Sequence, residues 1–126
     1  MERVRFFDHY GHRILLLDCT ACEPDELVEV FEQARLIIAA EPPHSALTLA
    51  DFSGAQFNRK AADQMKVTAT YNRAHVKRSA IVGAEGLPDV YYHNLVSFSA
   101  REFPSFKTRE EAMDWLVSEK AERAAG

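Results

Sequence analysis

The sequence has few of the features that mark secreted or membrane-spanning proteins. It contains only two cysteines, Cys19 and Cys22, too few for a disulfide framework in a chain of 126 residues. The apolar run nearest the N-terminus, Ile14–Leu17, is far shorter than a signal-peptide core or a spanning helix. We therefore expect a cytoplasmic protein with free thiols and no stable membrane insertion.

Charge is modest in total, with a formal net value of -4, but it is unevenly distributed along the chain. Residues 1–57 carry ten acidic against four basic residues, whereas residues 58–78 carry six basic residues against Asp63 alone. This basic stretch indicates either a solvated helix face or a surface for an anion or acidic partner. Because the chain as a whole is acidic, nucleic acid is not an expected partner.

Apolar periodicity and turn residues divide the chain into alternating strands and helices. Asn58 is a natural helix N-cap, Pro24 and Pro88 suit first helical turns, and Thr108 with Glu111 forms a capping-box pattern. The patterns predict strands over 3–7, 12–19, 46–52, 76–83 and 102–106, and helices over 23–40, 59–75, 87–100 and 108–120.

The predicted order, β-β-α-β-α-β-α-β-α, indicates a single α/β domain over residues 1–126. We expect a mostly parallel five-stranded sheet whose first strand is an antiparallel edge. The faces of three helices are expected to be buried. These faces comprise Leu27, Phe31, Ala34 and Ile38; Ala62, Met65 and Ala69; and Ala112, Trp115 and Leu116.

The loop after the third predicted strand combines several features of a binding site. Sheets of this kind gather ligands at the carboxyl ends of their strands, where Asp51 and Ser53 lie. Asn58 caps the following helix, and Arg59 and Lys60 add two charges to its positive end. We predict that Asp51–Lys60 is a recognition site for an anion or partner; the alternative is that the two cations are simply solvated.

The two cysteines admit a redox interpretation that their context does not favour. Cys19 and Cys22 lie between a strand and a helix, as a thioredoxin-type dithiol does, but Cys19 still belongs to the strand. We expect a half-buried pair of small apolar side chains. A mixed zinc site with His9 and His12 is excluded by length, because the strand separates the two pairs by about 20 Å.

Two further motifs carry weaker signals. Gly83–Gly86 lacks the spacing of a nucleotide-binding loop, so a plain turn is expected. Tyr91 and Tyr92, in the third predicted helix, are candidates for lining a ligand pocket, although a core aromatic with its hydroxyl at the rim is the commoner outcome. No motif indicates a metal, a cofactor or a catalytic residue.

Three segments together resemble the SpoIIAA-like proteins, a bacterial branch of the STAS domains. They are "ALTLADFSGAQF", "KRSAIVGAEGL" and "REFPSFKTREEAMDWL", and they extend the resemblance over nearly the whole chain. The resemblance implies successive β-α turns, similar also to the lipid-carrying core of CRAL-TRIO proteins. It implies neither a cofactor nor a catalytic residue, in a branch whose members are mostly uncharacterised.

The best understood STAS proteins, the anti-sigma factor antagonists, carry a phosphoacceptor serine that this chain lacks. Asp51, Ser53 and Phe57 match their loop, but their next motif, Asp-Ser-Ser-Gly, is replaced here by Arg59-Lys60-Ala61-Ala62. The resemblance therefore implies the scaffold without the phospho-switch, and we do not expect Ser53 to be a regulatory phosphosite.

These observations lead to three ranked hypotheses. The first is a non-catalytic STAS-like module that binds a protein partner or a small anionic or amphipathic ligand, working as a homodimer. The dimer depends on Ala46, Thr48 and Ala50 forming a small, mildly polar sheet face that the helices leave open. The second is a carrier of a lipid or other hydrophobic molecule, with the third helix as a mobile wall. The third is an enzyme, redox or hydrolytic.

Overall fold

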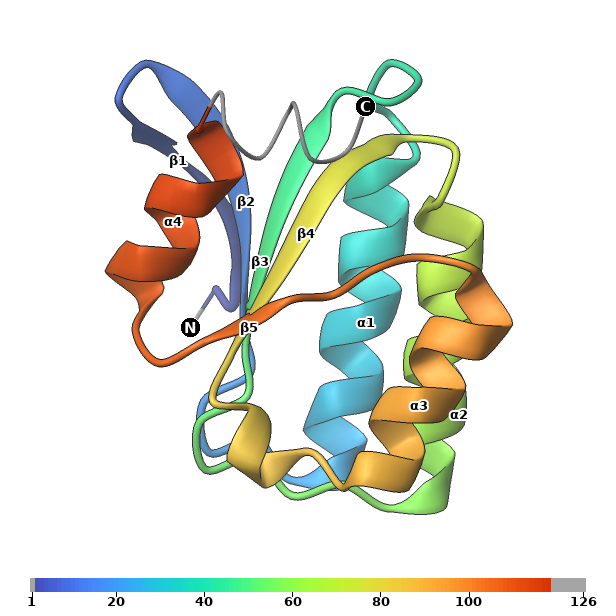
Figure 1. The fold of residues 1–126 in the computed structure, drawn as a ribbon. Coiled ribbons are helices and arrows are strands. Elements are labelled where there is room, and N and C mark those ends of the chain that lie inside the picture. The colour runs from blue at the N-terminus through green and yellow to red at the C-terminus, as the bar shows by residue number, and fades with distance from the viewer. Residues whose placement is uncertain (1, 119–126) are drawn as a thin grey trace.

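The computed structural model describes residues 2–118 and contains five strands and four α-helices (Figure 1). The strands are β1 (Val4–His9), β2 (His12–Asp18), β3 (Ala46–Asp51), β4 (Val76–Val82) and β5 (Ser105–Phe106). The helices are α1 (Pro24–Ile38), α2 (Arg59–Asn72), α3 (Asp89–Ser99) and α4 (Arg109–Val117), with a short 3-10 helix, η1 (Ala84–Gly86), before α3.

The strands form one sheet in the spatial order β1-β2-β3-β4-β5. β1 pairs antiparallel with β2, and the remaining pairs are parallel. α1, α2 and α3 cover one face of the sheet, whereas α4 lies on the other face (Figure 1). The predicted element order and the antiparallel edge strand are therefore confirmed. No helix in residues 2–118 is long and apolar enough to cross a bilayer.

Local sequence explains where several elements begin and turn. Tyr10 and Gly11 both have positive φ, as the two central residues of a tight hairpin between right-twisted strands require. Asn58 caps α2 as predicted, because its side-chain oxygen accepts a hydrogen bond from the Ala61 backbone nitrogen at 2.9 Å. α1 begins at Pro24, as predicted from its fixed φ.

Apolar side chains form two clusters, one on each face of the sheet. The larger cluster fills the space between the sheet and α1–α3, and it includes all the predicted inward residues of α1 together with Met65 and Ala69 of α2. The smaller cluster lies under α4 and includes Leu47 and Leu49 of β3. A sheet covered on both faces explains why the inner strands are apolar on both sides.

The expected open sheet face does not exist. Ala46 and Thr48 are buried, and Thr48 and Ala50 line a cavity beneath α1–α3, so the prediction that these three residues form an exposed face is wrong. Alternation along a strand identifies two faces but not which one the helices cover. The prediction of a homodimer was based on this open face. It therefore loses its support and stays untested.

α4 is held by its N-cap and by two buried side chains. Thr108 accepts a hydrogen bond from the Glu111 backbone nitrogen at 3.2 Å, and Ala112 and Leu116 are fully buried. Trp115, which was expected to be buried with them, is only partly so and packs against Phe106, with their ring centroids 5.7 Å apart. Residues 119–120 of the predicted helix lie outside the described residues.

Leu116 and Trp115 of α4 are buried to different extents, so replacing each with alanine should lower the free energy of unfolding by different amounts. Leu116→Ala should lower the free energy of unfolding by about 2–5 kcal/mol, because it removes a fully buried side chain. Trp115→Ala should cost less than the about 3–5 kcal/mol of a fully buried tryptophan, because part of its ring is already exposed. Urea unfolding of the two variants measures both values, and a larger loss for Trp115→Ala than for Leu116→Ala would contradict this placement.

Candidate functional site

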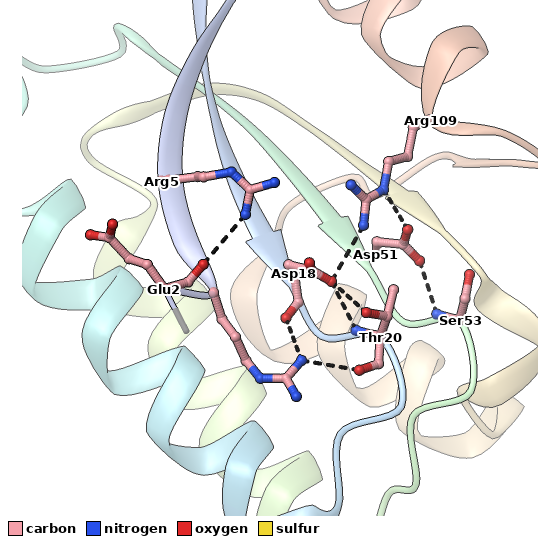
Figure 2. Close-up of polar contacts among 8 residues, drawn as sticks. Glu2, Arg5, Asp18, Thr20, Asp51, Ser53 and Arg109 are labelled. Carbon is pink, nitrogen blue, oxygen red and sulfur yellow. Dashed lines mark hydrogen bonds and ion pairs between the residues drawn. The ribbon is translucent and has the colours of Figure 1, made fainter.

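Two aspartates meet at the carboxyl ends of neighbouring strands. Asp18 ends β2 and Asp51 ends β3, and the two residues are paired in the parallel register. Arg109, the first residue of α4, reaches across the sheet and bridges them (Figure 2). Its Nε donates to Asp51 Oδ2 at 2.6 Å, and its Nη2 donates to Asp18 Oδ1 at 3.3 Å. One cation thus holds two carboxylates that would otherwise repel each other.

Each aspartate also organises the turn that follows its strand (Figure 2). Asp51 is 5% exposed, and its Oδ1 accepts a hydrogen bond from the Ser53 backbone nitrogen at 2.9 Å. Asp18 Oδ1 accepts hydrogen bonds from the backbone nitrogen of Thr20 at 3.2 Å and from its hydroxyl at 2.6 Å. The two strand ends therefore have the same design, an Asp-x-Ser/Thr turn closed on the aspartate.

Arg3 forms hydrogen bonds with the first of these turns, the one that follows β2. Its Nη1 donates to the carbonyl oxygens of Asp18 at 3.1 Å and Thr20 at 3.0 Å, and its Nη2 lies 3.4 Å from a Glu26 carboxylate oxygen. The turn after β2 is thereby joined to the residue that precedes β1 and, through Glu26, to α1. Beside it, Arg5 donates to the Glu2 carbonyl oxygen at 3.4 Å (Figure 2).

Hydrogen bonds and cations stabilise the ionised form of Asp18. Its burial alone would raise the pKa, but the two hydrogen bonds from Thr20 and the positive charges of Arg109 and Arg3 outweigh that effect. The net result is a pKa below the ordinary value of 3.8. Asp18 is therefore fully charged at neutral pH and available to hold Arg109.

The loop between β3 and α2, residues 52–58, is joined by backbone hydrogen bonds to the turn after β2. The Ala21 nitrogen donates to the Ser53 oxygen at 2.8 Å, and the Gln56 nitrogen donates to the Cys22 oxygen at 2.9 Å. Within the loop, the Ala55 nitrogen donates to the Phe52 oxygen at 2.9 Å. These bonds fix the path of the chain from Asp51 toward α2.

The turn after β4 packs directly against this loop. Gly83 has φ +72°, and a Cβ atom there would lie only 2.7 Å from the Ser53 Cα, too close for any other residue. Residues Ala84–Gly86 form η1, and the left-handed Gly83 precedes it, so Gly83–Gly86 is the turn that was predicted. Its glycine at position 83 serves the close approach to Ser53.

The predicted site residues divide into two groups. Asp51 and Ser53 belong to the group of hydrogen-bonded residues around Arg109. Arg59 and Lys60 instead lie exposed at the start of α2, beyond the cap residue Asn58. Arg59 lines a shallow groove between α2 and α3, which we call the α2–α3 groove; its other lining residues are Ala62, Asp63, Lys66, Tyr91 and Asn94. A second shallow surface along α2 includes both Arg59 and Lys60.

The two tyrosines of α3 point to different surroundings. Tyr91 lines the α2–α3 groove with Arg59, which brings it together with part of the predicted site. Tyr92 instead donates its hydroxyl hydrogen to the Phe103 carbonyl oxygen at 2.7 Å and borders a separate surface hollow near Trp115. The structure therefore joins Tyr91, but not Tyr92, to the predicted recognition residues.

Sequence reasoning missed Asp18 and Arg109. A signal for Asp18 was present, because Asp18-Cys19-Thr20 and Asp51-Phe52-Ser53 repeat one pattern at the ends of two neighbouring strands. No signal in the sequence indicated Arg109, because it lies far along the chain and meets Asp18 and Asp51 only through the placement of α4.

The cysteine pair is more deeply buried than expected. Both Cys19 and Cys22 are inaccessible to solvent, and the Cys22 nitrogen donates to the Cys19 oxygen at 3.2 Å across a tight turn. A hydrogen bond between the two thiols raises the pKa of Cys19 and lowers that of Cys22. Their behaviour as ordinary thiols stays a prediction. In residues 2–118, no group of three or more His, Cys, Asp or Glu side chains is arranged to hold a metal ion.

Comparison with known proteins does not identify a family. No family model matches the chain, and no curated protein matches it significantly. The fold agrees with the architecture expected from the SpoIIAA-like resemblance, but one fold serves many functions. Function must therefore be argued from the residues of the site.

The lowered pKa of Asp18 predicts a defined loss of stability in acid. Because the folded-state pKa lies below the unfolded-state value, the stabilisation is complete above about pH 4 and is lost as the pH falls through the folded-state value. Asp18→Asn should lower stability at pH 7 and flatten the acid decline. Urea unfolding at a series of pH values measures both effects. An acid decline in Asp18→Asn as steep as that of the wild type would show that Asp18 does not contribute.

Proposed function

We propose that the protein is a non-catalytic, STAS-like binding module of the cytoplasm that recognises an acidic segment of a protein partner. The contact surface would be Arg59 and Lys60 at the start of α2, together with Tyr91 in the α2–α3 groove. A small anionic ligand at the same residues is the other form that this proposal takes.

The observation that carries the proposal is the contrast between the two ends of one loop. At its base, the charges of Asp51 and Arg109 satisfy each other. At its far end, Arg59 and Lys60 are both exposed, and neither forms an ion pair within the described part of the chain. Lys66, one turn further on, is by contrast paired with Asp63 at 3.5 Å. A hydrogen-bonded loop that leads to two unpaired cations at the start of α2 suits binding, because little further order has to be imposed on this segment.

The start of α2 also bears on regulation by phosphorylation. Ala61 and Ala62 occupy the positions at which the resembling antagonists carry the acceptor serine and the following glycine, and both are buried against the core. No hydroxyl is therefore presented on this turn, and two cations precede it. We propose that α2 attracts an anionic group from a partner and is not itself made anionic.

The carrier hypothesis receives less support. The cavity between the sheet and α1–α3 measures about 60 Å³, far below the volume of ordinary ligand sites of about 300–1,000 Å³. In α3, the helix expected to be the mobile wall, the apolar residues Val90 and Phe98 are 60% and 55% exposed and face away from the cavity. Lipid carriage would require a rearrangement of α3.

Charge reversal at the start of α2 tests the proposal. We expect a fluorescent glutamate-rich peptide to bind the wild-type protein measurably by anisotropy at low ionic strength, and more weakly as salt is added. Arg59→Glu with Lys60→Glu should lower the affinity at least about tenfold, because two attractive charges become repulsive. Titration with phosphate and with sulfate distinguishes an acidic peptide from a small anion as the preferred ligand.

A matched double variant controls for net charge. Arg73→Glu with Lys107→Glu makes the same change in charge at two other exposed positions, one after α2 and one before α4. It should retain most of the peptide affinity, and both variants should keep the wild-type melting temperature. If the two double variants lose affinity equally, or if the wild type binds neither peptide nor anions, the proposed surface is wrong.

A further inference from the structure

A cavity of about 60 Å³ lies between the sheet and the helices α1–α3. Most of its wall is apolar and is contributed by residues that include Phe31, Ile38, Met65, Leu95 and Phe103. A single water requires only about 10–15 Å³ of such space, so the cavity has room for several waters or for one small organic molecule. Its polar lining decides between these occupants.

One part of the wall carries a cation without a counter-ion. Arg101, between α3 and β5, donates from Nη1 to the Ala69 carbonyl oxygen at 2.9 Å and from Nη2 to the Ser79 hydroxyl at 2.6 Å. Within residues 2–118, no carboxylate pairs with it. Burial lowers its pKa to about 10, so the guanidinium remains charged at neutral pH. Arg101 is partly buried, and its Cζ lies 4.7 Å from the centroid of the Phe103 ring. All of its partners are neutral, so its charge remains available to an anion.

Asn72 contributes a second polar group to the lining of the same cavity. Its side chain is only 6% exposed and lines the cavity, yet its amide makes no hydrogen bond to the described residues. An amide that lines a cavity without a protein partner is available to bind a water or a ligand there. Nearby, the Thr48 and Ser79 hydroxyls are hydrogen-bonded to each other at 2.6 Å.

We propose that this cavity binds a small aliphatic carboxylate, such as acetate, propionate or butyrate. The carboxylate accepts hydrogen bonds from Arg101 and from the Asn72 amide, and the alkyl end packs against Phe31, Met65 and Leu95. The positive charge of Arg101 favours an anionic ligand, because Arg101 has no acidic partner among the described residues. The apolar remainder of the wall disfavours phosphate or sulfate, whose oxygens would be left without donors.

The proposal is independent of the recognition surface on α2. Arg101 is only partly buried, so the polar end of the cavity lies near the protein surface, between α3 and β5. A ligand can therefore reach Arg101 without opening the sheet. Arg59 and Lys60 line other surfaces, and their replacement should leave carboxylate binding intact.

The test is a titration of the 126-residue chain with butyrate, propionate and acetate at constant ionic strength. Melting temperature and the methyl NMR signal of Met65 report binding, and Met65 places the ligand because it lines the cavity. We expect saturable changes in both with butyrate. Butyramide, the neutral analogue of butyrate, should bind at least about tenfold more weakly, because it cannot form the charge-assisted hydrogen bonds.

Two variants with a matched control complete the test. Asn72→Asp places a carboxylate on the wall of the cavity that Arg101 also lines, and it should keep the fold while lowering butyrate affinity at least about tenfold. Arg101→Gln should lower it similarly, and Arg73→Gln, an exposed arginine at the end of α2, should leave it unchanged. If Arg101→Gln does not fold, Asn72→Asp decides.

Several outcomes would overturn the proposal. One is the absence of any saturable change in the wild type, which would mean that water alone fills the cavity. Another is butyramide binding as tightly as butyrate, and a third is unchanged butyrate affinity in folded Asn72→Asp. A loss of butyrate binding in Arg59→Glu with Lys60→Glu would move the anion site to α2 and equally contradict this assignment.

Discussion

The bridge from Arg109 to two aspartates is the interaction on which the arrangement of the site depends. Parallel pairing places Asp18 and Asp51 side by side at the carboxyl edge of the sheet, where two negative charges would repel each other. Arg109 removes that repulsion by hydrogen-bonding to both carboxylates. The same contact attaches the start of α4 to the two central strands, so that α4 covers the second apolar face of the sheet.

The Arg109 bridge also distinguishes charged groups that hold the structure together from charged groups that can bind a partner. The carboxylates of Asp18 and Asp51 are each bonded both to Arg109 and to the turn that follows their strand. Their role is to hold the loop, while Arg59 and Lys60 at its other end remain exposed. The protein thus combines a pre-ordered loop with unpaired cations, and pre-ordering lowers the entropic cost of binding a partner.

Local patterns in the sequence were sufficient for the elements, because caps and periodicity act over a few residues. Asn58, Pro24 and the inward face of α1 were all predicted correctly. The orientation of β3 and the partial exposure of Trp115 were not, since both depend on which helix covers which face. Arg109 and Arg101 required the tertiary structure for the same reason: each meets its partners across many residues of chain. Asp18 is the exception, because the same Asp-x-Ser/Thr pattern follows both β2 and β3 and could have been recognised in the sequence.

Native-state hydrogen exchange at the Ser53 amide tests the central role of Arg109 most directly. This amide donates to Asp51 Oδ1, the carboxylate that Arg109 holds, so the account predicts strong protection in the wild-type protein. In Arg109→Leu, Ser53 exchange should accelerate at least about tenfold more than exchange at Phe31 in α1, which reports the general loss of stability. Exchange of Ser53 near the rate of an unstructured peptide in the wild type, or equal acceleration at Ser53 and Phe31, would contradict the account.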